Sequence, residues 1–343
     1  MKKILTFSVL ILLLWTLAFS GSCKSDKPAP KPVPVLPFAK GADIGWLTEM
    51  EAAGKKFYNA AGTEMDCIAL LKSLGMNSIR LRVWVNPSSG WNNAADVLAK
   101  ATRAKNAGMR LMIDFHYSDT WADPGQQAIP VAWAAQTLTE LQTSVYNHTF
   151  SVLESLKSNG IVPEWVQVGN ETNNGMLWPI GKASTSMSNF ASLVKQGYNA
   201  VKAVDPSIKV ILHLSNGYDN NLYRWIFDGM ISNGVSWDII GMSLYPEPID
   251  WATRNSQCLA NINDMISRYG REVMITEVGM SWDQADACRS FITDLITKCK
   301  AVSGNKVLGV FYWEPQSYGN WQGYTKGAFD NAGKPTIALN AFN

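Results

Sequence analysis

The sequence has 343 residues, with 30 lysines and arginines against 28 aspartates and glutamates, 47% hydrophobic residues and 17% charged residues. This length suits one large α/β domain, and the composition is that of an ordinary globular protein, neither disordered nor membrane-spanning in its body. A formal net charge of +2 gives no basic excess that would recruit nucleic acid or anionic lipid, so we expect a neutral partner.

Residues 1–22 predict a signal peptide. Lys2 and Lys3 precede an apolar run from Ile4 to Phe19, which is short for a transmembrane span. The small residues that lead to Cys23 resemble a bacterial lipobox, in which the cysteine is lipidated and becomes the mature N-terminus. A plain signal peptide with an incidental cysteine is the alternative. We expect an exported bacterial lipoprotein, facing the cell surface or the periplasm and touching the membrane only through Cys23.

Residues 23–38 predict a lipidated N-terminus followed by a spacer. Prolines recur there at positions 28, 30, 32, 34 and 37 among lysines. Such a stretch favours extended polyproline II structure and acts as a semi-rigid spacer. The catalytic domain is therefore expected to span residues 39–343.

In this domain, eight short apolar runs alternate with amphipathic segments. Continuous β-branched runs of this length are typical of parallel strands buried on both faces. The expected strands are Ala42–Ile44, Ser78–Trp84, Arg110–Phe115, Trp165–Val168, Lys209–Leu214, Trp237–Met242, Val273–Thr276 and Lys306–Tyr312. Eightfold strand–helix repetition predicts a single (β/α)8 TIM barrel of the α/β class. An open doubly wound sheet is the alternative, but no glycine-rich phosphate loop follows an early strand.

Helical periodicity separates the runs. Apolar residues at helical spacing extend from Leu138 to Leu156, and again from Met187 to Val201. Residues 63–66 resemble a capping box, which would begin a helix that ends at Gly75.

Four cysteines remain after Cys23. Cys67, Cys258, Cys288 and Cys299 could pair in three ways in an exported chain. Their spacings match no zinc motif, so free buried thiols are the competing interpretation.

Polar and aromatic residues gather where the apolar runs end, which is where a TIM barrel carries its active site. The candidates, in chain order, are Arg80, Arg82, Trp84, Asp114, His116, Trp121, Asn170, Glu171, His213, Tyr245, Glu277, Trp313 and Glu314. A random distribution would place such residues at both ends of the strands.

Two of these residues supply the pair of carboxyls that glycoside hydrolysis requires, one to protonate the leaving oxygen and one to attack or to activate water. Glu171 ends the fourth run and Glu277 ends the seventh, so both can point to the centre of the barrel from opposite sides. An isolated Asn-Glu dipeptide carries little information. The pair on these two strands, with Arg80 on the second and Tyr245 after the sixth, is far more specific.

Several longer stretches carry a resemblance to a known family. They are GADIGWL (41–47), NSIRLRVWVNP (77–87), DFHYSDTWADPGQQ (114–127), WVQVGNE (165–171), ITEVG (275–279) and GAFDNAGK (327–334). With them the chain resembles clan A glycoside hydrolases, and among these the family 53 endo-β-1,4-galactanases, which cleave galactan and type I arabinogalactan. The resemblance implies a retaining, endo-acting glycosidase with Glu171 as acid/base and Glu277 as nucleophile. It also implies that Asn170 bonds the sugar 2-hydroxyl.

Other residues are assigned roles that fit this chemistry. We expect Arg80 to hold the pKa of Glu277 low, Tyr245 to donate to the same carboxylate, and burial to raise the pKa of Glu171. Arg82 faces inward or forms a structural ion pair. Candidate substrate contacts are His116 and Asp114 on the third strand, Trp313 as the floor of the cleavage subsite, and Trp84 and Trp121 as walls.

We expect no metal and no other cofactor, because the segment after Glu277 lacks a dense run of hard oxygen ligands. A monomer acting on a polysaccharide is the expected assembly. The nearest alternative is another clan A endo-β-glycanase, such as a mannanase or a glucanase. A non-catalytic sugar-binding surface lipoprotein is the alternative from a different class.

Overall fold

The computed structural model describes residues 37–343. The expected signal peptide, Cys23 and nearly all of the spacer lie outside the described residues. Among the helices that are described, none combines the length and the apolar character that a membrane crossing requires.

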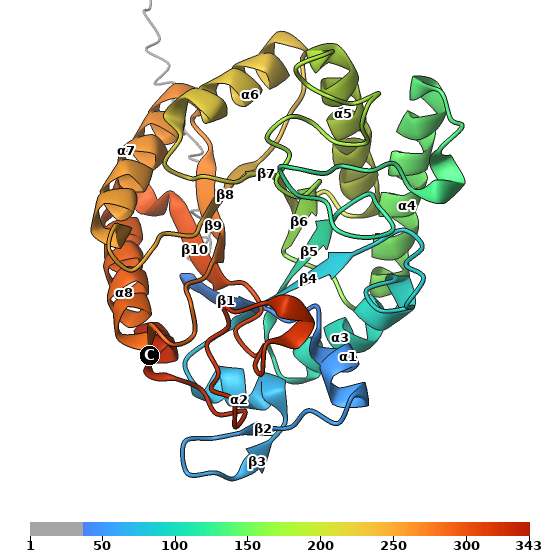
Figure 1. Cartoon of the computed structure of the whole chain (residues 1–343). Coiled ribbons are helices and arrows are strands. Elements are labelled where there is room, and N and C mark those ends of the chain that lie inside the picture. Colours follow the sequence, from blue (N-terminus) through green and yellow to red (C-terminus); the bar gives the residue numbers. More distant parts are fainter. Residues whose placement is uncertain (1–36) are drawn as a thin grey trace, which may run out of the picture. The chain divides into compact units, whose positions relative to one another are not determined.

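Eight parallel strands close into a barrel in the order β1-β10-β9-β8-β7-β6-β5-β4 (Figure 1). The strands are β1 Ala39–Asp43, β4 Ser78–Val83, β5 Arg110–Phe115, β6 Trp165–Val168, β7 Lys209–Leu214, β8 Ile239–Leu244, β9 Glu272–Val278 and β10 Val307–Tyr312. The sheet is closed because β1 pairs with both β4 and β10. The predicted (β/α)8 TIM barrel is therefore confirmed, and the open sheet is excluded.

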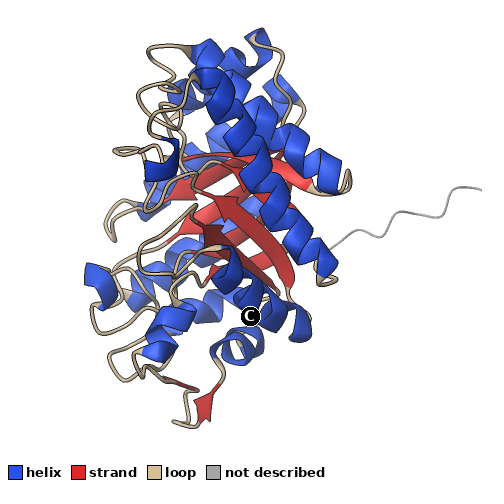
Figure 2. Ribbon diagram, turned by 90° about the vertical axis from the view of Figure 1, so that its right-hand side faces the viewer, coloured by secondary structure: helices blue, strands red, loops and turns tan. Residues whose placement is uncertain are grey.

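Helices cover the outside of the strands (Figures 1 and 2). They are α1 Leu47–Ala52, α2 Cys67–Ser73, α3 Ala94–Asn106, α4 Leu138–Ser158, α5 Met187–Val204, α6 Asn220–Ser232, α7 Trp251–Tyr269 and α8 Ala285–Ala301. A small antiparallel pair, β2 Phe57–Tyr58 and β3 Glu64–Met65, lies between α1 and α2 in the chain.

Three local predictions are corrected or decided by the structure. The capping box over residues 63–66 is wrong: Asp66 is the N-cap of α2, and its Oδ1 accepts from the Ala69 N–H at 2.9 Å. The first strand begins three residues earlier than expected, at Ala39. The cysteines that follow Cys23 are free and buried, so the interpretation as buried thiols holds.

The interior of the barrel is layered along the strands. Side chains from seven strands form an apolar cluster near the middle of the barrel: Ala39, Met112, Trp165, Ile211, Ile239, Met274 and Phe311. Two residues further along three of these strands come Asp114, Gln167 and His213, all buried, with Gln167 hydrogen-bonded to the other two. Because side chains alternate along a strand with a period of two, these polar groups point into the barrel above the apolar layer.

Candidate active site

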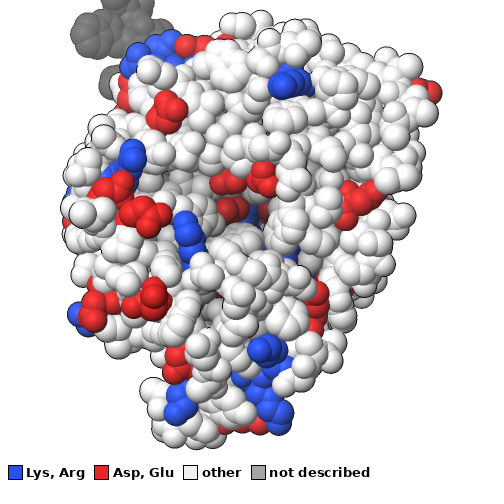
Figure 3. All heavy atoms as spheres, viewed as in Figure 1, with Lys and Arg blue, Asp and Glu red and all other residues white. Residues whose placement is uncertain are grey.

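The carboxyl ends of the strands surround a hollow in which acidic side chains gather (Figure 3). Beside them lies a cavity of about 460 Å³ whose lining includes five aromatic side chains: Trp46, Trp84, Trp121, Trp313 and Tyr324. Aromatic faces beside carboxyl groups are the combination expected where a sugar chain is bound and cleaved.

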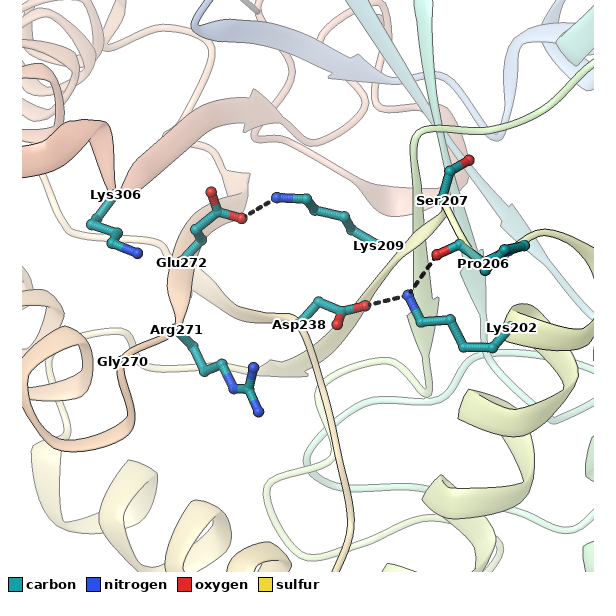
Figure 4. Close-up of a pocket in the computed structure, with 9 residues that line it drawn as sticks. All are labelled: Lys202, Pro206, Ser207, Lys209, Asp238, Gly270, Arg271, Glu272 and Lys306. Carbon is teal, nitrogen blue, oxygen red and sulfur yellow. Dashed lines mark hydrogen bonds and ion pairs between the residues drawn. The ribbon is translucent and has the colours of Figure 1, made fainter. Parts of the chain in front are cut away.

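A second hollow lies at the amino ends of β7 to β10 and has a different character (Figure 4). Its two acidic groups are each paired with a lysine: Lys202 lies 2.7 Å from Asp238, and Lys209 contacts Glu272. Its lining contains no aromatic residue. In a TIM barrel this end serves stability, so the candidate site is the hollow at the carboxyl ends.

Arg80 on β4 is the centre of the polar layer and is fully buried. Its Nε donates to Gln167 Oε1 at 2.6 Å, and Nη1 donates to Asp43 Oδ2 at 2.7 Å. Nη2 donates to Asp114 Oδ2 and to Asn170 Oδ1, each at 2.9 Å. The guanidinium is therefore held in one orientation by four side chains, from β1, from β5, from β6 and from the turn that follows β6.

Glu277 near the end of β9 is the fifth partner of this guanidinium. Its Oε1 lies 2.8 Å from Arg80 Nη2, but no directed hydrogen bond reaches that oxygen. An Nη nitrogen carries two hydrogens, and those of Arg80 Nη2 already point to Asp114 and Asn170. Tyr245 donates to the other oxygen, Oε2, at 2.9 Å. Glu277 thus keeps one oxygen that Arg80 stabilises electrostatically and that accepts no directed hydrogen bond from the described residues.

Glu171 lies across the barrel, directly after β6 and Asn170. Its φ is +43°, in the left-handed region that non-glycine residues rarely adopt. Tyr117, Asn216 and Glu314 also have positive φ, between 48° and 53°, and each follows a barrel strand closely. Strained backbone of this kind collects at functional sites, here at the ends of four strands.

The two glutamates influence each other's protonation. Burial raises the pKa of Glu171, while a hydrogen bond from Ser243 and the charge of Arg80 lower it. Burial also raises the pKa of Glu277, against the charge of Arg80 and with the help of the Glu171 carboxylate. The expectation that Arg80 would hold the pKa of Glu277 low is therefore wrong, because burial and the neighbouring carboxylates outweigh the one guanidinium.

A coupled pair of carboxyls of this kind holds one proton between its members near neutral pH. Arg80 and Tyr245 both stabilise the ionised form of Glu277. Glu171 has no ion pair with a cation within 4.0 Å in the described residues. The donors therefore favour a negative charge on Glu277 and a proton on Glu171.

The candidate substrate-binding residues differ in whether their polar side-chain atoms remain available to a ligand. Asp114 is fully buried, and its oxygens accept from Arg80, His116 and Gln167. His116 Nε2 contacts Asp114 at 3.0 Å, and its Nδ1 accepts from the Ala122 N–H at 3.1 Å. The polar side-chain atoms of both residues are therefore already bonded to protein groups.

Asn170 Nδ2 donates one of its two hydrogens to the Ala122 carbonyl oxygen at 2.8 Å. Its second hydrogen remains for a ligand.

The predicted tryptophans come together with one that the sequence did not single out. Trp313 and Trp121 both contact Trp46, with ring centroids 5.1 and 5.6 Å apart, and Trp84 lies 5.1 Å from Trp121. Trp46 comes from the loop after β1. Tyr324, from the loop after β10, lies 4.6 Å from Trp313 and completes the aromatic cluster.

Arg82 lies beneath this aromatic cluster and forms the structural ion pair considered from the sequence. Its Nη1 contacts Glu314, and its guanidinium lies 4.5 Å from the centroid of the Trp121 ring. Two of its nitrogens have no hydrogen-bond acceptor, which fits a cation enclosed by aromatic faces.

Sequence reasoning also missed Asp43, Gln167 and Ser243. Each lies on a barrel strand and points inward. Strand alternation is the signal that could have found them, because side chains two residues apart on a strand point to the same face. Gln167, for example, is two residues from Trp165 on β6. The described residues contain no group of three or more histidine, cysteine, aspartate or glutamate side chains placed to hold a metal ion.

Comparison with known proteins identifies the family. The model of glycosyl hydrolase family 53 matches residues 39–342. A protein of Neosartorya fischeri named "Probable arabinogalactan endo-beta-1,4-galactanase A" is 35% identical over 298 residues, 80% of this chain and 83% of the relative. The solved catalytic domain of a family 53 glycoside hydrolase from Ignisphaera aggregans is 32% identical, with a TM-score of 0.81 over 91% of this chain and 98% of that one. A solved fungal β-1,4-galactanase is 30% identical, with a TM-score of 0.81 over 89% of this chain and 98% of that one. The resemblance seen in the sequence is confirmed, and the chain belongs to glycosyl hydrolase family 53.

Proposed function

We propose that the protein is a retaining endo-β-1,4-galactanase that cleaves galactan and type I arabinogalactan. The arrangement of Glu277 carries this proposal. One of its oxygens is held by Tyr245, and the other lies beside Arg80 without a hydrogen bond of its own. Such an oxygen is suited to attack carbon, and sugar binding alone would not require it.

In the first step, Glu277 Oε1 attacks the anomeric carbon while the bond from that carbon to the leaving oxygen breaks. Glu171 transfers its proton to the departing oxygen, so the leaving sugar is released as an alcohol. The attacked sugar is then an ester of Glu277. Esterification removes the negative charge of Glu277. The pKa of Glu171 then falls, because each carboxylate of the pair raises the pKa of the other.

In the second step, Glu171 is ionised and takes a proton from water, which attacks the same carbon and releases Glu277. Two inversions at one carbon give net retention. Asn170 would donate its remaining amide hydrogen to the sugar 2-hydroxyl, an interaction that strengthens as positive charge develops on the ring. Asp114 and His116 act as positioning residues for Arg80 and Trp84, since their polar atoms are occupied.

The names of the related proteins support galactan as the substrate, and the aromatic cluster supports a polymer. Rings from four segments line one side of the hollow, enough for more than one sugar residue. A viscosity assay tests the function: galactan should lose viscosity rapidly with little early monosaccharide. Efficient hydrolysis of carboxymethyl cellulose or mannan, with galactan untouched, would contradict it.

We propose further that the protein is exported, anchored through a lipid on Cys23 and active as a monomer. The lipobox-like segment supports the anchor, and the completeness of the site within one chain supports the monomer. Replacement of Cys23 by alanine should move the enzyme from the membrane fraction to the soluble one or leave its precursor unprocessed. An unchanged membrane fraction would contradict the anchor.

A further inference from the structure

Basic side chains gather along one part of the rim that the amino ends of the strands form. The strands of this part are neighbours in the barrel, in the order β1-β10-β9-β8-β7. We call the set the basic arc, and its members are Lys40, Lys202, Lys209, Arg271, Lys300 and Lys306. Arg271 and Lys300 are exposed, and the other four are half-buried. The formal net charge of +2 does not reveal this grouping, because it sums over both ends of the barrel.

The carboxylates on this part of the rim neutralise only two members of the arc. Lys202 Nζ lies 2.7 Å from Asp238 Oδ2, and Lys209 contacts Glu272. Asp205, the third carboxylate there, forms no ion pair within 4.0 Å with a described residue. Six cations therefore lie beside three anions.

Three members of the arc have no carboxylate partner. Arg271, Lys300 and Lys306 form no ion pair within 4.0 Å with any residue of the part 37–343. Arg271 and Lys306 line the hollow of about 420 Å³ at the amino ends of β7 to β10, where no dashed line reaches either of them (Figure 4). The hollow thus presents positive charge that these residues do not neutralise.

The arc continues to the point where the described chain begins. Lys300 Nζ lies 5.4 Å from the centre of the Phe38 ring, and Phe38 directly precedes β1. Burial and the neighbouring charge of Lys300 lower the pKa of Lys40, so these two ammonium groups repel each other. An anion bound between them would relieve that repulsion. Because the described part starts at Pro37, the residues that follow Cys23 join the barrel at this same end.

We propose that the basic arc binds the phosphate groups of an anionic lipid surface, with the amino ends of the strands facing the membrane and the active site facing away from it. The proposal rests on the export and the Cys23 anchor proposed above, and it adds a second contact with the membrane. A chain extends at most about 3.5 Å per residue, so the segment from Cys23 to Pro37 keeps an anchored barrel within about 50 Å of the bilayer. One lipid chain holds a protein weakly, and a basic patch beside it is a recognised second attachment.

The opposite end of the barrel has the opposite charge. Acidic side chains gather in the hollow at the carboxyl ends of the strands (Figure 3). An anionic surface attracts the amino ends and repels the carboxyl ends, so both forces favour the same orientation. In that orientation the hollow with Glu171 and Glu277 stays open to a polymer that approaches from outside the cell.

Co-sedimentation with lipid vesicles tests the arc, with the full chain carrying Cys23→Ala so that no lipid can be attached. Vesicles that contain phosphatidylglycerol should bind this protein more tightly than vesicles of phosphatidylcholine alone, and the difference should vanish at high salt. Adding Arg271→Gln, Lys300→Gln and Lys306→Gln should weaken binding to the anionic vesicles at least about tenfold.

The matched control combines Lys56→Gln, Lys195→Gln and Arg289→Gln. It removes the same number of positive charges from exposed side chains outside the arc and should retain the affinity. Both triple variants should hydrolyse soluble galactan as wild type does, which shows that they are folded.

Hydrogen exchange measures the orientation without turnover. In the wild-type chain, anionic vesicles should slow exchange in segments 268–272 and 302–306, and phosphatidylcholine vesicles should not. Equal binding of the two triple variants to anionic vesicles, or slowed exchange at the carboxyl ends of the strands instead, would overturn the proposal. So would binding of inorganic phosphate or polygalacturonate by the arc without binding of anionic vesicles. If Cys23 is not lipidated, the anchor fails while the co-sedimentation still tests the arc.

Discussion

Arg80 Nη2 lies 2.8 Å from Glu277 Oε1, yet its two hydrogens point to Asp114 and Asn170. The arginine therefore stabilises the charge of Glu277 without occupying the lone pair that would attack the substrate. This geometry explains how a strongly paired carboxylate can remain a nucleophile.

This relationship predicts a large effect for Arg80→Lys. Lysine keeps the charge but cannot bond Asp43, Gln167, Asp114 and Asn170 together, because it is a point donor without the planar fork. We expect kcat/KM to fall at least about a hundredfold and the free energy of unfolding to fall by about 2–5 kcal/mol. Steady-state kinetics and urea unfolding measure the two effects.

The control for this variant is Arg268→Lys. Arg268 pairs with Asp228 at 2.7 Å on the outer helices, and both side chains are largely accessible. Solvent screens the charges of an exposed pair, so this variant should behave as wild type. Arg80→Lys with wild-type activity would show that the guanidinium is not needed to hold the site.

The raised pKa of Glu171 predicts how stability depends on pH. A carboxyl whose pKa is higher in the folded state binds more protons in the folded state than in the unfolded state. The free energy of unfolding therefore falls as the pH rises from the ordinary pKa of 4.5 through the raised pKa of Glu171. Glu171→Gln removes that loss. The variant should be about 1–3 kcal/mol more stable than wild type at pH 8, and the difference should disappear near pH 4.

Thermal unfolding of both proteins across this range measures the difference. The exposed Glu154→Gln on α4 is the control and should show no such trend. A Glu171→Gln protein that is less stable than wild type at pH 8 would mean that the carboxylate is well satisfied in the folded state.

The aromatic cluster predicts a role for Trp46, which the sequence did not single out. Trp46 contacts Trp121, Trp313 and Tyr324, so its loss should disorder the surface on which the sugar chain lies. We expect Trp46→Ala to raise KM for galactan about tenfold with a smaller change in kcat, since binding energy away from the reacting atoms is removed. Trp225→Ala on α6 is the control, because that side chain is 42% exposed and far along the chain from the cluster. Equal KM values in the two variants would separate Trp46 from substrate binding.

Much of the fold could be predicted because barrel strands are buried on both faces and leave continuous apolar runs. Trp165–Val168 was predicted with its observed bounds for this reason. The start of the first strand is not predictable in this way, because Ala39, Lys40 and Gly41 do not form an apolar run, although Ala39 pairs with Gly309 of β10. The sequence does not decide the cap of α2, because Thr63 and Asp66 both offer capping side chains, and only the path of the chain determines which one begins the helix.

The site was partly readable for a related reason. Arg80 and Glu277 lie on barrel strands, and Asn170, Glu171 and Tyr245 come just after strands, so their position in the sequence predicts their position in space. Trp46 and Tyr324 come from loops, whose path no periodic pattern records. The direction of the Glu277 pKa could not be predicted either, since it depends on burial and on how many carboxylates surround one guanidinium.

The most direct test of the account is to identify the residue that becomes covalently attached to substrate. A 2-deoxy-2-fluoro galactoside with an activated leaving group should form the ester rapidly and release it slowly, because fluorine destabilises both oxocarbenium-like transition states. Mass spectrometry of the intact protein should show one added sugar, and peptide mapping should place it on Glu277. The Glu277→Ala variant should remain unlabelled, and Glu171→Ala should still be labelled, because an activated leaving group needs little protonation. A label on Glu171, or labelling of Glu277→Ala, would contradict the assignment of Glu277 as the nucleophile.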